Sequence, residues 1–535
     1  MATTFQIFLL LLTVFAGTAA VAKKFNLAPA ILLMVVGIAF AFMPGLPRVV
    51  LEPEVVMQIL LPPLIYSAGV SMSWREFKFN LRPIIALAIG CVIFTTCAVA
   101  AATHYVLGLP LSVGFVLGAI VSPPDVVAPL AIARRLGLPR RILVVLEGEG
   151  LANDATALIL YRFAVVAIGT SAFSMVKATE TFFTIVVCEV LFGIAVGWLS
   201  LRLRQWAHEP RIEITLSLLT PYLAFWVPEH LGGSGVLATV ACGLYVSWNG
   251  PLLISSATRL QGIFFWDLVI WLIEGILFLL IGFQMRLLVE KHNALPLSEV
   301  LTAIALVSVI VIVARFIWVF PATYLPRWLS KHVREHDPVV SWRQPFIVAF
   351  TGIRGVVSLA AALAIPLTLP DGQNFPHRDL ILFVAFGVIF VTLVGIGLTL
   401  PMVVKALNLA RHGQAETIHE RESEIAARRE ILHAARNSLK EIIVERNLPE
   451  SLAKFLQSRH EMRMQALPDP PSVAGTPTPA TRGAAMVREM ISIERKLLHQ
   501  LLRDGKITDE VRRRIERDLD LEEAVVDNRE KSTPL

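Results

Sequence analysis

A succession of about thirteen apolar segments occupies the first 404 residues of the 535-residue chain. Most of them reach the roughly 20 residues that a helix needs to cross the hydrocarbon core of a bilayer. Lipid offers no hydrogen-bonding partners, so such segments favour helices, which pair their own backbone groups. The sequence therefore predicts an all-α polytopic membrane protein. The approximate segments are 4–22, 26–44, 49–71, 83–107, 111–134, 142–169, 177–201, 212–229, 233–249, 261–289, 298–322, 343–368 and 380–404.

The charged residues indicate how the chain is oriented. They make up 17% of the sequence, compared with about 25% in soluble proteins. With the N-terminus outside, the inner loops hold 19 Lys and Arg residues and the outer loops hold five. This asymmetry predicts a multi-pass protein of the cell (inner) membrane with a cytoplasmic C-terminus. Acidic and basic residues balance after residue 405, so the net charge of +6 belongs to the membrane part and indicates no nucleic-acid partner.

Two of the apolar segments are interrupted. The fifth contains Ser122-Pro123-Pro124-Asp125, in which the twin prolines remove two backbone donors from a helix. The twelfth contains a second break, from Gly352 to Gly355. The two segments cross the membrane in opposite directions, because their positions in the series differ by an odd number. Broken helices in corresponding places of two inverted repeats are typical of the binding site of a secondary transporter.

The sixth segment carries charges where a membrane helix usually carries hydrocarbon. The run from Glu149 to Asp154 contains two carboxylates and an amide, and each buried charge costs at least about 2.5–3.5 kcal/mol. Asp154 can bind either a proton or a monovalent cation such as Na⁺, and Asn153 can add a carbonyl oxygen. Glu149 shares a helix face with Asn153. Arg354 is permanently charged, and we expect it to hold Glu149 in a structural ion pair.

Other polar residues of the membrane part are candidates for accessory roles. Asp125 is a third candidate for the cation- and proton-binding set, beside Asp154 and Asn153, and is expected to orient the amide of the sixth segment or to cap the half-helix that follows. Ser122 lies in the same break and is a candidate for an accessory role. Glu213 lies near a cytoplasmic end, where it can line an entrance. Glu274 is deeper and is a candidate for a second functional carboxylate. Arg162 is interpreted as a snorkelling or internally paired side chain.

These motifs resemble those of the first cation:proton antiporter family, which contains prokaryotic NhaP-type and animal NHE-type sodium/proton exchangers. The run 148–155 is similar to the family's helix-six motif GESLxNDA, the run 122–125 to its S-x-T-D, and the run 352–355 to its GLRG. The resemblance covers about residues 10–405. It implies an NhaA-like antiporter fold with inverted repeats and two broken crossing helices. It also implies a homodimer in which a six-helix core moves against a dimerisation domain.

The resemblance further implies an activity. Family members are secondary antiporters, not enzymes, and need no cofactor beyond the transported Na⁺ and H⁺. Members with Asn-Asp in helix six and Arg in helix twelve are electroneutral, so one cation per proton is expected at Asn153 and Asp154, with roles in pH and sodium homeostasis. Pro124 and Gly150 stand where the family commonly has Thr and Ser. Backbone carbonyls or water must therefore replace two hydroxyl oxygens.

The sequence changes from apolar segments to a charged, polar segment at about residue 411. Residues 1–410 are predicted to form the antiporter domain, and residues 411–535 a cytoplasmic helical tail. Helices are expected over 415–446, 449–466, 484–504 and 507–527, with a Pro-rich linker near 467–483. The tail is interpreted either as a regulatory hairpin or dimer contact, or as a solvated segment without a role in gating.

Two other function classes compete with antiport. The run 232–235 matches the GxSG pattern of intramembrane serine proteases, but nucleophilic catalysis needs a histidine base within the membrane. The candidates His292, His332, His336 and His377 lie in loops or at a helix end. A channel or ion sensor on the same fold is the third class, and no re-entrant filter loop is apparent. Neither alternative accounts for the charges of the fifth, sixth and twelfth segments.

Overall fold

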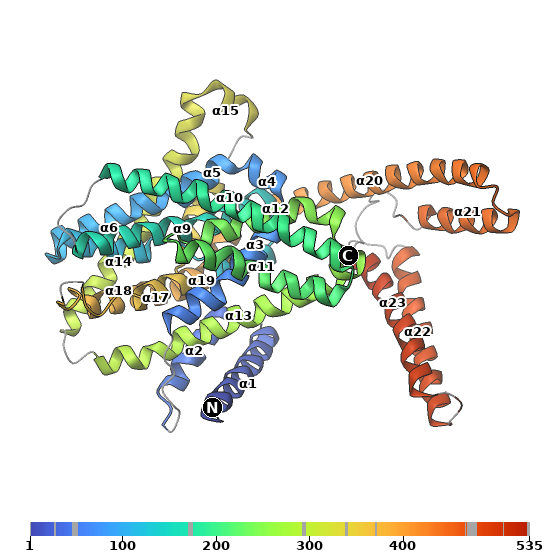
Figure 1. Cartoon of the computed structure of the whole chain (residues 1–535), viewed down its shortest axis with the longest axis horizontal. Coiled ribbons are helices and arrows are strands. Elements are labelled where there is room, and N and C mark those ends of the chain that lie inside the picture. Colours follow the sequence, from blue (N-terminus) through green and yellow to red (C-terminus); the bar gives the residue numbers. More distant parts are fainter. Residues whose placement is uncertain are drawn as a thin grey trace. The chain divides into compact units, whose positions relative to one another are not determined.

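The computed structural model describes residues 2–25, 28–44, 52–169, 175–291, 296–337, 341–369, 372–465, 467, 479–504, 506 and 508–531. Within these residues the regular secondary structure is helical, apart from one isolated antiparallel bridge between Thr368 and Asn374. The chain forms two compact units, Met1–Gly413 and Gln414–Leu535 (Figure 1). The predicted all-α fold is confirmed.

The helices of the first unit include seven that are long and apolar enough to cross a membrane, counted over the described residues, and three shorter apolar ones. The predicted number of about thirteen spans stays a prediction. The helices are α1 (Ala2–Phe25), α2 (Pro29–Ala41), α3 (Leu61–Ser71), α4 (Trp74–Phe79), α5 (Leu81–Ile85), α6 (Val92–Leu107), α7 (Leu111–Val121), α8 (Val127–Arg135), α9 (Arg140–Gly169), α10 (Met175–Ala207), α11 (Pro210–His230), α12 (Val236–Leu253), α13 (Ser256–Lys291), α14 (Leu297–Leu329), α15 (Lys331–His336), α16 (Arg343–Phe350), α17 (Val356–Leu363), α18 (Arg378–Val391) and α19 (Gly397–Ala406). Three π-helical stretches, η1 (Val55–Leu60), η2 (Ala86–Cys91) and η4 (Thr392–Ile396), adjoin α3, α6 and α19.

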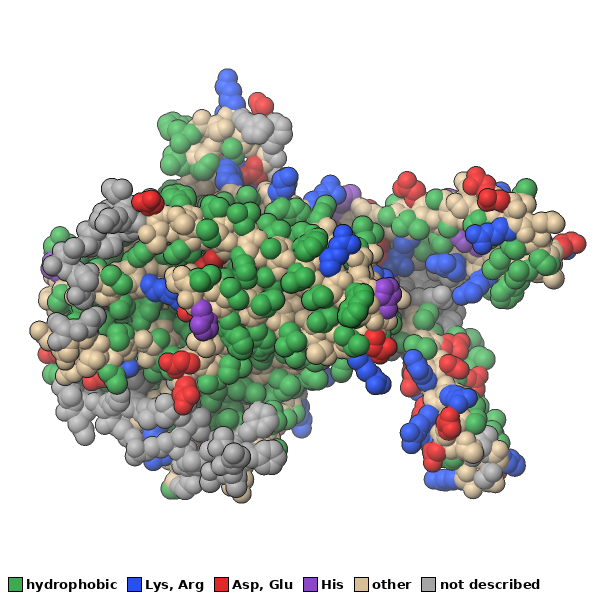
Figure 2. Space-filling model, viewed as in Figure 1, with side chains coloured by type: hydrophobic (Ala, Val, Ile, Leu, Met, Phe, Trp, Pro, Cys, Tyr) green, Lys and Arg blue, Asp and Glu red, His purple; other side chains and the backbone are tan. Residues whose placement is uncertain are grey.

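The outer surface of the first unit is apolar. Hydrophobic side chains cover most of the face seen in Figure 2. Large exposed ones include Leu219, Leu223, Ile263, Phe264 and Trp271. Contiguous exposed apolar surface of this extent is unusual on a soluble monomer and marks a surface that contacts lipid or a partner. The surface thus agrees with a multi-pass membrane protein.

Both predicted helix interruptions are present. The fifth apolar segment is split between α7, which ends at Val121, and α8, which begins at Val127. The twelfth is split between α16, which ends at Phe350, and α17, which begins at Val356. The half-helix α7 packs against α6, α9, α17 and α18, so the two broken segments meet inside the bundle. Unwound backbone at membrane depth is tolerated only where protein or water surrounds it.

A close helix contact fixes α7 in this position. A Cβ atom added to Gly118 of α7 would lie 2.6 Å from the carbonyl oxygen of Thr96 in α6. Glycine therefore lets the two backbones approach, as small residues do at membrane helix interfaces. The core around them is built from aliphatic side chains of α7, α17 and α18, including Leu117, Leu359 and Val388.

The second unit contains the charged tail. It comprises most of α20 (Ala410–Glu445), together with α21 (Glu450–Gln465), α22 (Pro479–Arg503) and α23 (Asp509–Lys531). The last two pack against each other, and Arg495 of α22 pairs with Asp520 and Glu523 of α23. These helices agree with the four expected from the sequence to within a few residues. The predicted Pro-rich linker lies largely outside the described residues.

Candidate functional site

The two helix breaks are joined directly by a backbone hydrogen bond. The amide of Asp125, in the first break, donates to the carbonyl oxygen of Ile353, in the second, at 2.7 Å. The Asp125 carboxylate accepts from the amide of Val127 at 2.9 Å, so it caps the first turn of α8. A cap of this kind satisfies a backbone donor that the break leaves without a helical partner. The predicted capping role of Asp125 is therefore present in the structure.

Arg354 binds the end of a half-helix. Its Nε donates to the carbonyl oxygen of Val121 at 2.8 Å, and one Nη to that of Ser122 at 3.2 Å. The other Nη donates to the carbonyl oxygen of Gly352. Its own amide donates to the hydroxyl of Thr392 at 3.0 Å. A guanidinium group at the C-terminal end of α7 satisfies orphan carbonyls and complements the negative end of the helix dipole.

The structure corrects the predicted partner of Glu149. The carboxylate of Glu149 is paired with Arg315 of α14, through Nη1 at 2.5 Å and Nη2 at 2.8 Å. Arg354 does not pair with it, because its donors are committed to the backbone carbonyls of the two breaks. Arg315 also donates from Nε to the carbonyl oxygen of Val348 at 3.1 Å. Glu149 and Arg315 are 0% and 1% exposed, so this bidentate pair is fully buried.

Asn153 and Asp154 face the first break. The Asn153 amide nitrogen donates to the carbonyl oxygen of Pro124 at 2.7 Å. Its Oδ1 is buried and has no hydrogen-bond partner in the described part of the chain. Asp154 is half-buried. Among the described residues, no hydrogen bond or ion pair to its side chain is found. An amide oxygen and a carboxylate without partners thus lie on consecutive residues, beside unwound backbone.

Two further carboxylates lie close enough to interact electrostatically with this site. The charge of Asp125 acts on both Asp154 and Glu274, and Glu274 is half-buried in α13. The sequence-predicted accessory residue Glu274 is therefore near Asp125. Glu213 is buried in the first turn of α11, and no described contact connects it to these carboxylates. The Ser122 hydroxyl is held by Thr96 at 3.1 Å, so Ser122 positions the break.

Arg162 has a paired role, one of its two predicted interpretations. It forms an ion pair with Glu229 of α11 at 2.5 Å. It also donates to the carbonyl oxygens of Gly232 and Gly233 in the turn that follows α11. These contacts connect the C-terminal half of α9 to the segment between α11 and α12.

The contact between the breaks can be tested at Gly355. A Cβ atom there would lie 1.7 Å from Oδ2 of Asp125 and 2.5 Å from its Cβ. We expect Gly355→Ala to destabilise the first unit by about 1–3 kcal/mol, the cost of overpacking. The matched control is Gly395→Ala, because a Cβ at Gly395 meets no atom within 4 Å. Thermal unfolding of the detergent-solubilised chain measures both, and equal unfolding temperatures would contradict this contact.

The arrangement defines a class of protein. Two broken helices that meet inside a helical membrane unit, beside buried and half-buried carboxylates, are the architecture of secondary ion transporters. The family model "Sodium/hydrogen exchanger, transmembrane" matches residues 10–406. The chain therefore belongs to the sodium/hydrogen exchanger family, as the sequence motifs predicted.

Individual relatives agree with this assignment. An uncharacterized Na⁺/H⁺ exchanger of Mycobacterium bovis is 34% identical over 94% of this chain and 92% of its own length. A sodium, potassium, lithium and rubidium/H⁺ antiporter of Bacillus pumilus is 30% identical over 85% of this chain and 69% of its own. The solved structure of a sodium proton antiporter from Methanocaldococcus jannaschii aligns with TM-score 0.58 and 18% identity, over 77% of this chain and 98% of that one. The last comparison supports the fold.

Proposed function

We propose that this protein exchanges a monovalent cation, Na⁺, for protons across the membrane, and that cation and proton compete for Asp154. One observation carries the proposal. Asp154 has no partner among the described residues, and the adjacent Asn153 Oδ1 is buried without one. Carboxylate and carbonyl oxygens suit hard cations. The same carboxylate can instead hold a proton, so the two ligands exclude each other.

The surrounding charges support a one-for-one exchange. Glu149 is neutralised by Arg315 at 2.5 and 2.8 Å, and Asp125 caps α8. Among the carboxylates of α9 and the first break, Asp154 is then the one left to cycle. A bound Na⁺ and a bound proton give the site the same charge, so each transport cycle moves no net charge. The proposed role is homeostasis of pH and sodium.

Exchange also requires the site to open to each side of the membrane in turn. We place the protein in the inner membrane with the N-terminus outside and the C-terminus in the cytoplasm. We propose a homodimer, as the family resemblance implies. The contact of Arg162 with Glu229 and the Gly232–Gly233 turn joins α9 to α11 at one end of the bundle.

A cation panel tests the proposal. In everted membrane vesicles that are acidified inside and loaded with a pH-sensitive dye, adding Na⁺ should reverse the quenching of the dye. Li⁺ and K⁺ should be compared at equal concentrations, because the Bacillus pumilus relative is named for several alkali cations. Vesicles without the protein give the background. A signal equal to background for every cation, with the protein present in the membrane, would contradict antiport.

A further inference from the structure

A basic pocket lies at one end of the first unit, beside the half-helix α16 but outside the two helix breaks. It is formed where α5 and α9 begin and where α14 ends, beside α16. Its cavity volume is about 60 Å³, which is room for a few water-sized groups, such as the oxygens of one phosphate. None of the described residues that line it belongs to the Asp154 site. The function proposed above therefore leaves this pocket without a role.

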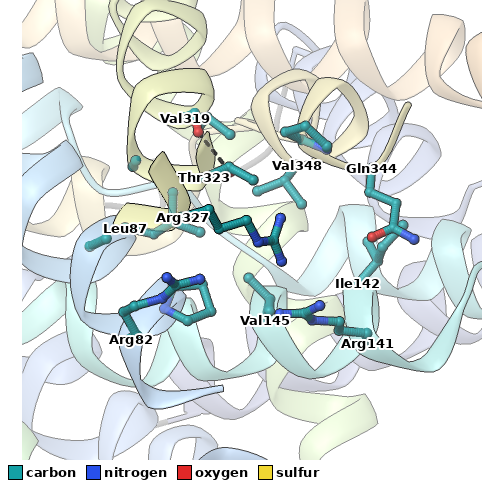
Figure 3. A pocket seen from close by; sticks show the side chains of 14 residues that line it. Arg82, Leu87, Arg141, Ile142, Val145, Val319, Thr323, Arg327, Gln344 and Val348 are labelled. Carbon is teal, nitrogen blue, oxygen red and sulfur yellow. Dashed lines mark hydrogen bonds between the residues drawn. The ribbon is translucent and has the colours of Figure 1, made fainter. Parts of the chain in front are cut away.

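Three arginines from three separate helices converge on the pocket. Arg82 comes from α5, Arg141 from α9 and Arg327 from α14, and Figure 3 shows their side chains around the same space. Their side chains are 34%, 22% and 13% exposed, so the pocket can be reached from outside. The arrangement brings together donors that are well suited to the oxygens of a phosphate group.

One carboxylate partly neutralises these arginines. Asp337, which follows α15, is bound by Arg82, by Arg141 at 2.5 Å and by Arg327 at 3.0 Å. The described lining residues contain no acidic side chain, and Arg82 and Arg141 share the single carboxylate of Asp337, so two positive charges face one negative charge there. In addition, Nη1 of Arg82 is buried without a hydrogen-bond partner in the described part of the chain. The pocket thus has both surplus positive charge and an unused donor.

The rest of the pocket is apolar. Leu87, Val145, Val319 and Val348 lie beside the arginines (Figure 3). A small hydrated anion gains nothing from such walls. A phospholipid headgroup, which carries a phosphate next to a glycerol backbone and acyl chains, can use both the charges and the apolar surface.

The position of the pocket also matches a lipid headgroup. Arg82, Arg141 and Arg327 lie within two residues of the ends of three candidate membrane spans, Leu81–Leu107, Arg140–Ile168 and Leu297–Leu329. Trp328 and Trp342, next to this end of α14 and α16, are 80% and 54% exposed. Tryptophan is enriched where the bilayer meets water, which is the level of the phosphate groups. Basic pockets between membrane helices at this level are known to bind acidic lipid headgroups.

We propose that this pocket binds the phosphate group of an anionic phospholipid, with Arg82, Arg141 and Arg327 as its ligands and Asp337 as a competing internal anion. Substitutions of the arginines and of Asp337 are expected to change lipid binding in opposite directions. Removing an arginine weakens lipid binding, and neutralising Asp337 strengthens it. It does not depend on which cation the protein transports.

Native mass spectrometry of the full chain in a neutral detergent tests the proposal. Phosphatidylglycerol should bind the wild type more tightly than phosphatidylcholine does. Arg82→Gln should lower the phosphatidylglycerol affinity by about fivefold, the effect of one basic residue near an anionic surface. Asp337→Asn should raise it, and neither change should alter phosphatidylcholine binding.

Arg211→Gln is the matched control, because Arg211 is exposed at the start of α11, at the same end of the bundle and outside the pocket. It should bind both lipids as the wild type does. The proposal is overturned if Arg82→Gln and Arg211→Gln have equal phosphatidylglycerol affinities. It is also overturned if millimolar inorganic phosphate displaces the lipid, which would identify a site for a soluble anion.

Discussion

Vesicles that contain the Asp154→Asn variant are expected to show no cation-dependent proton movement above the background of empty vesicles. Asparagine has nearly the same shape as aspartate but neither releases a proton nor carries the charge that binds a cation. The substitution removes no hydrogen bond or ion pair that the Asp154 side chain makes with the described residues. The protein should therefore reach the membrane in normal amount and unfold at the wild-type temperature. Dye dequenching in everted vesicles and the amount of membrane-inserted protein measure the two quantities.

The matched control for this experiment is Asp267→Asn. It makes the same chemical change on α13, where Asp267 is exposed. Exchange by this variant should remain close to that of the wild type. Continued exchange by Asp154→Asn at normal abundance would exclude Asp154 as the residue that cycles, and Asp125 would become the next candidate.

Replacing Arg315 with methionine is expected to have the largest effect on stability. The substitution leaves the carboxylate of Glu149, which is 0% exposed, buried without a counter-charge. Breaking a buried ion pair in this way typically costs about 3–5 kcal/mol. Thermal unfolding of the detergent-solubilised protein should therefore occur at a much lower temperature than in the wild type. Arg211→Met, at an exposed position, should leave the unfolding temperature nearly unchanged.

The double variant Glu149→Leu/Arg315→Met separates the loss of the pair from the loss of arginine itself. Replacing both buried charges with apolar side chains is often neutral, so the double variant should recover much of the stability. A single variant as stable as the wild type would contradict the assignment of Glu149 and Arg315 as a buried pair.

The parts of the site that depend on local chemistry could be predicted from the sequence. Pro123 and Pro124 remove two backbone donors from an apolar segment, and the break after α7 lies where the sequence indicates it. Asp154 stands out because an aspartate deep in an apolar segment is costly. The all-helical fold follows from the length of the apolar segments. None of these inferences requires knowing which helices are neighbours.

The partner of Glu149 could not be predicted in this way. Arg315 and Arg354 both lie inside apolar segments, and the choice between them depends on how α9 packs against α14 and the second break. The sequence favours Arg354, because it is permanently charged and lies in the second helix break. The structure shows that its guanidinium is needed by the carbonyls at the end of α7. The isolated position of Arg315 in an apolar run was the one signal available for it.

The basic pocket could not be predicted from the sequence either. Arg82, Arg141 and Arg327 each count, in the sequence, only as a positive charge at a membrane boundary. Their convergence on Asp337 is a property of the folded bundle, because the four residues come from four separate parts of the chain.

Counting the protons released when Na⁺ binds tests the competition at Asp154 most directly. Isothermal titration calorimetry of the purified protein, in buffers that differ in ionisation enthalpy, gives this number. For the wild type, we expect up to one proton released per Na⁺ bound, with the number falling as the pH rises and the site deprotonates. Asp154→Asn should release none. Sodium binding by the wild type without any proton release across the pH range of activity would contradict competition at this carboxylate.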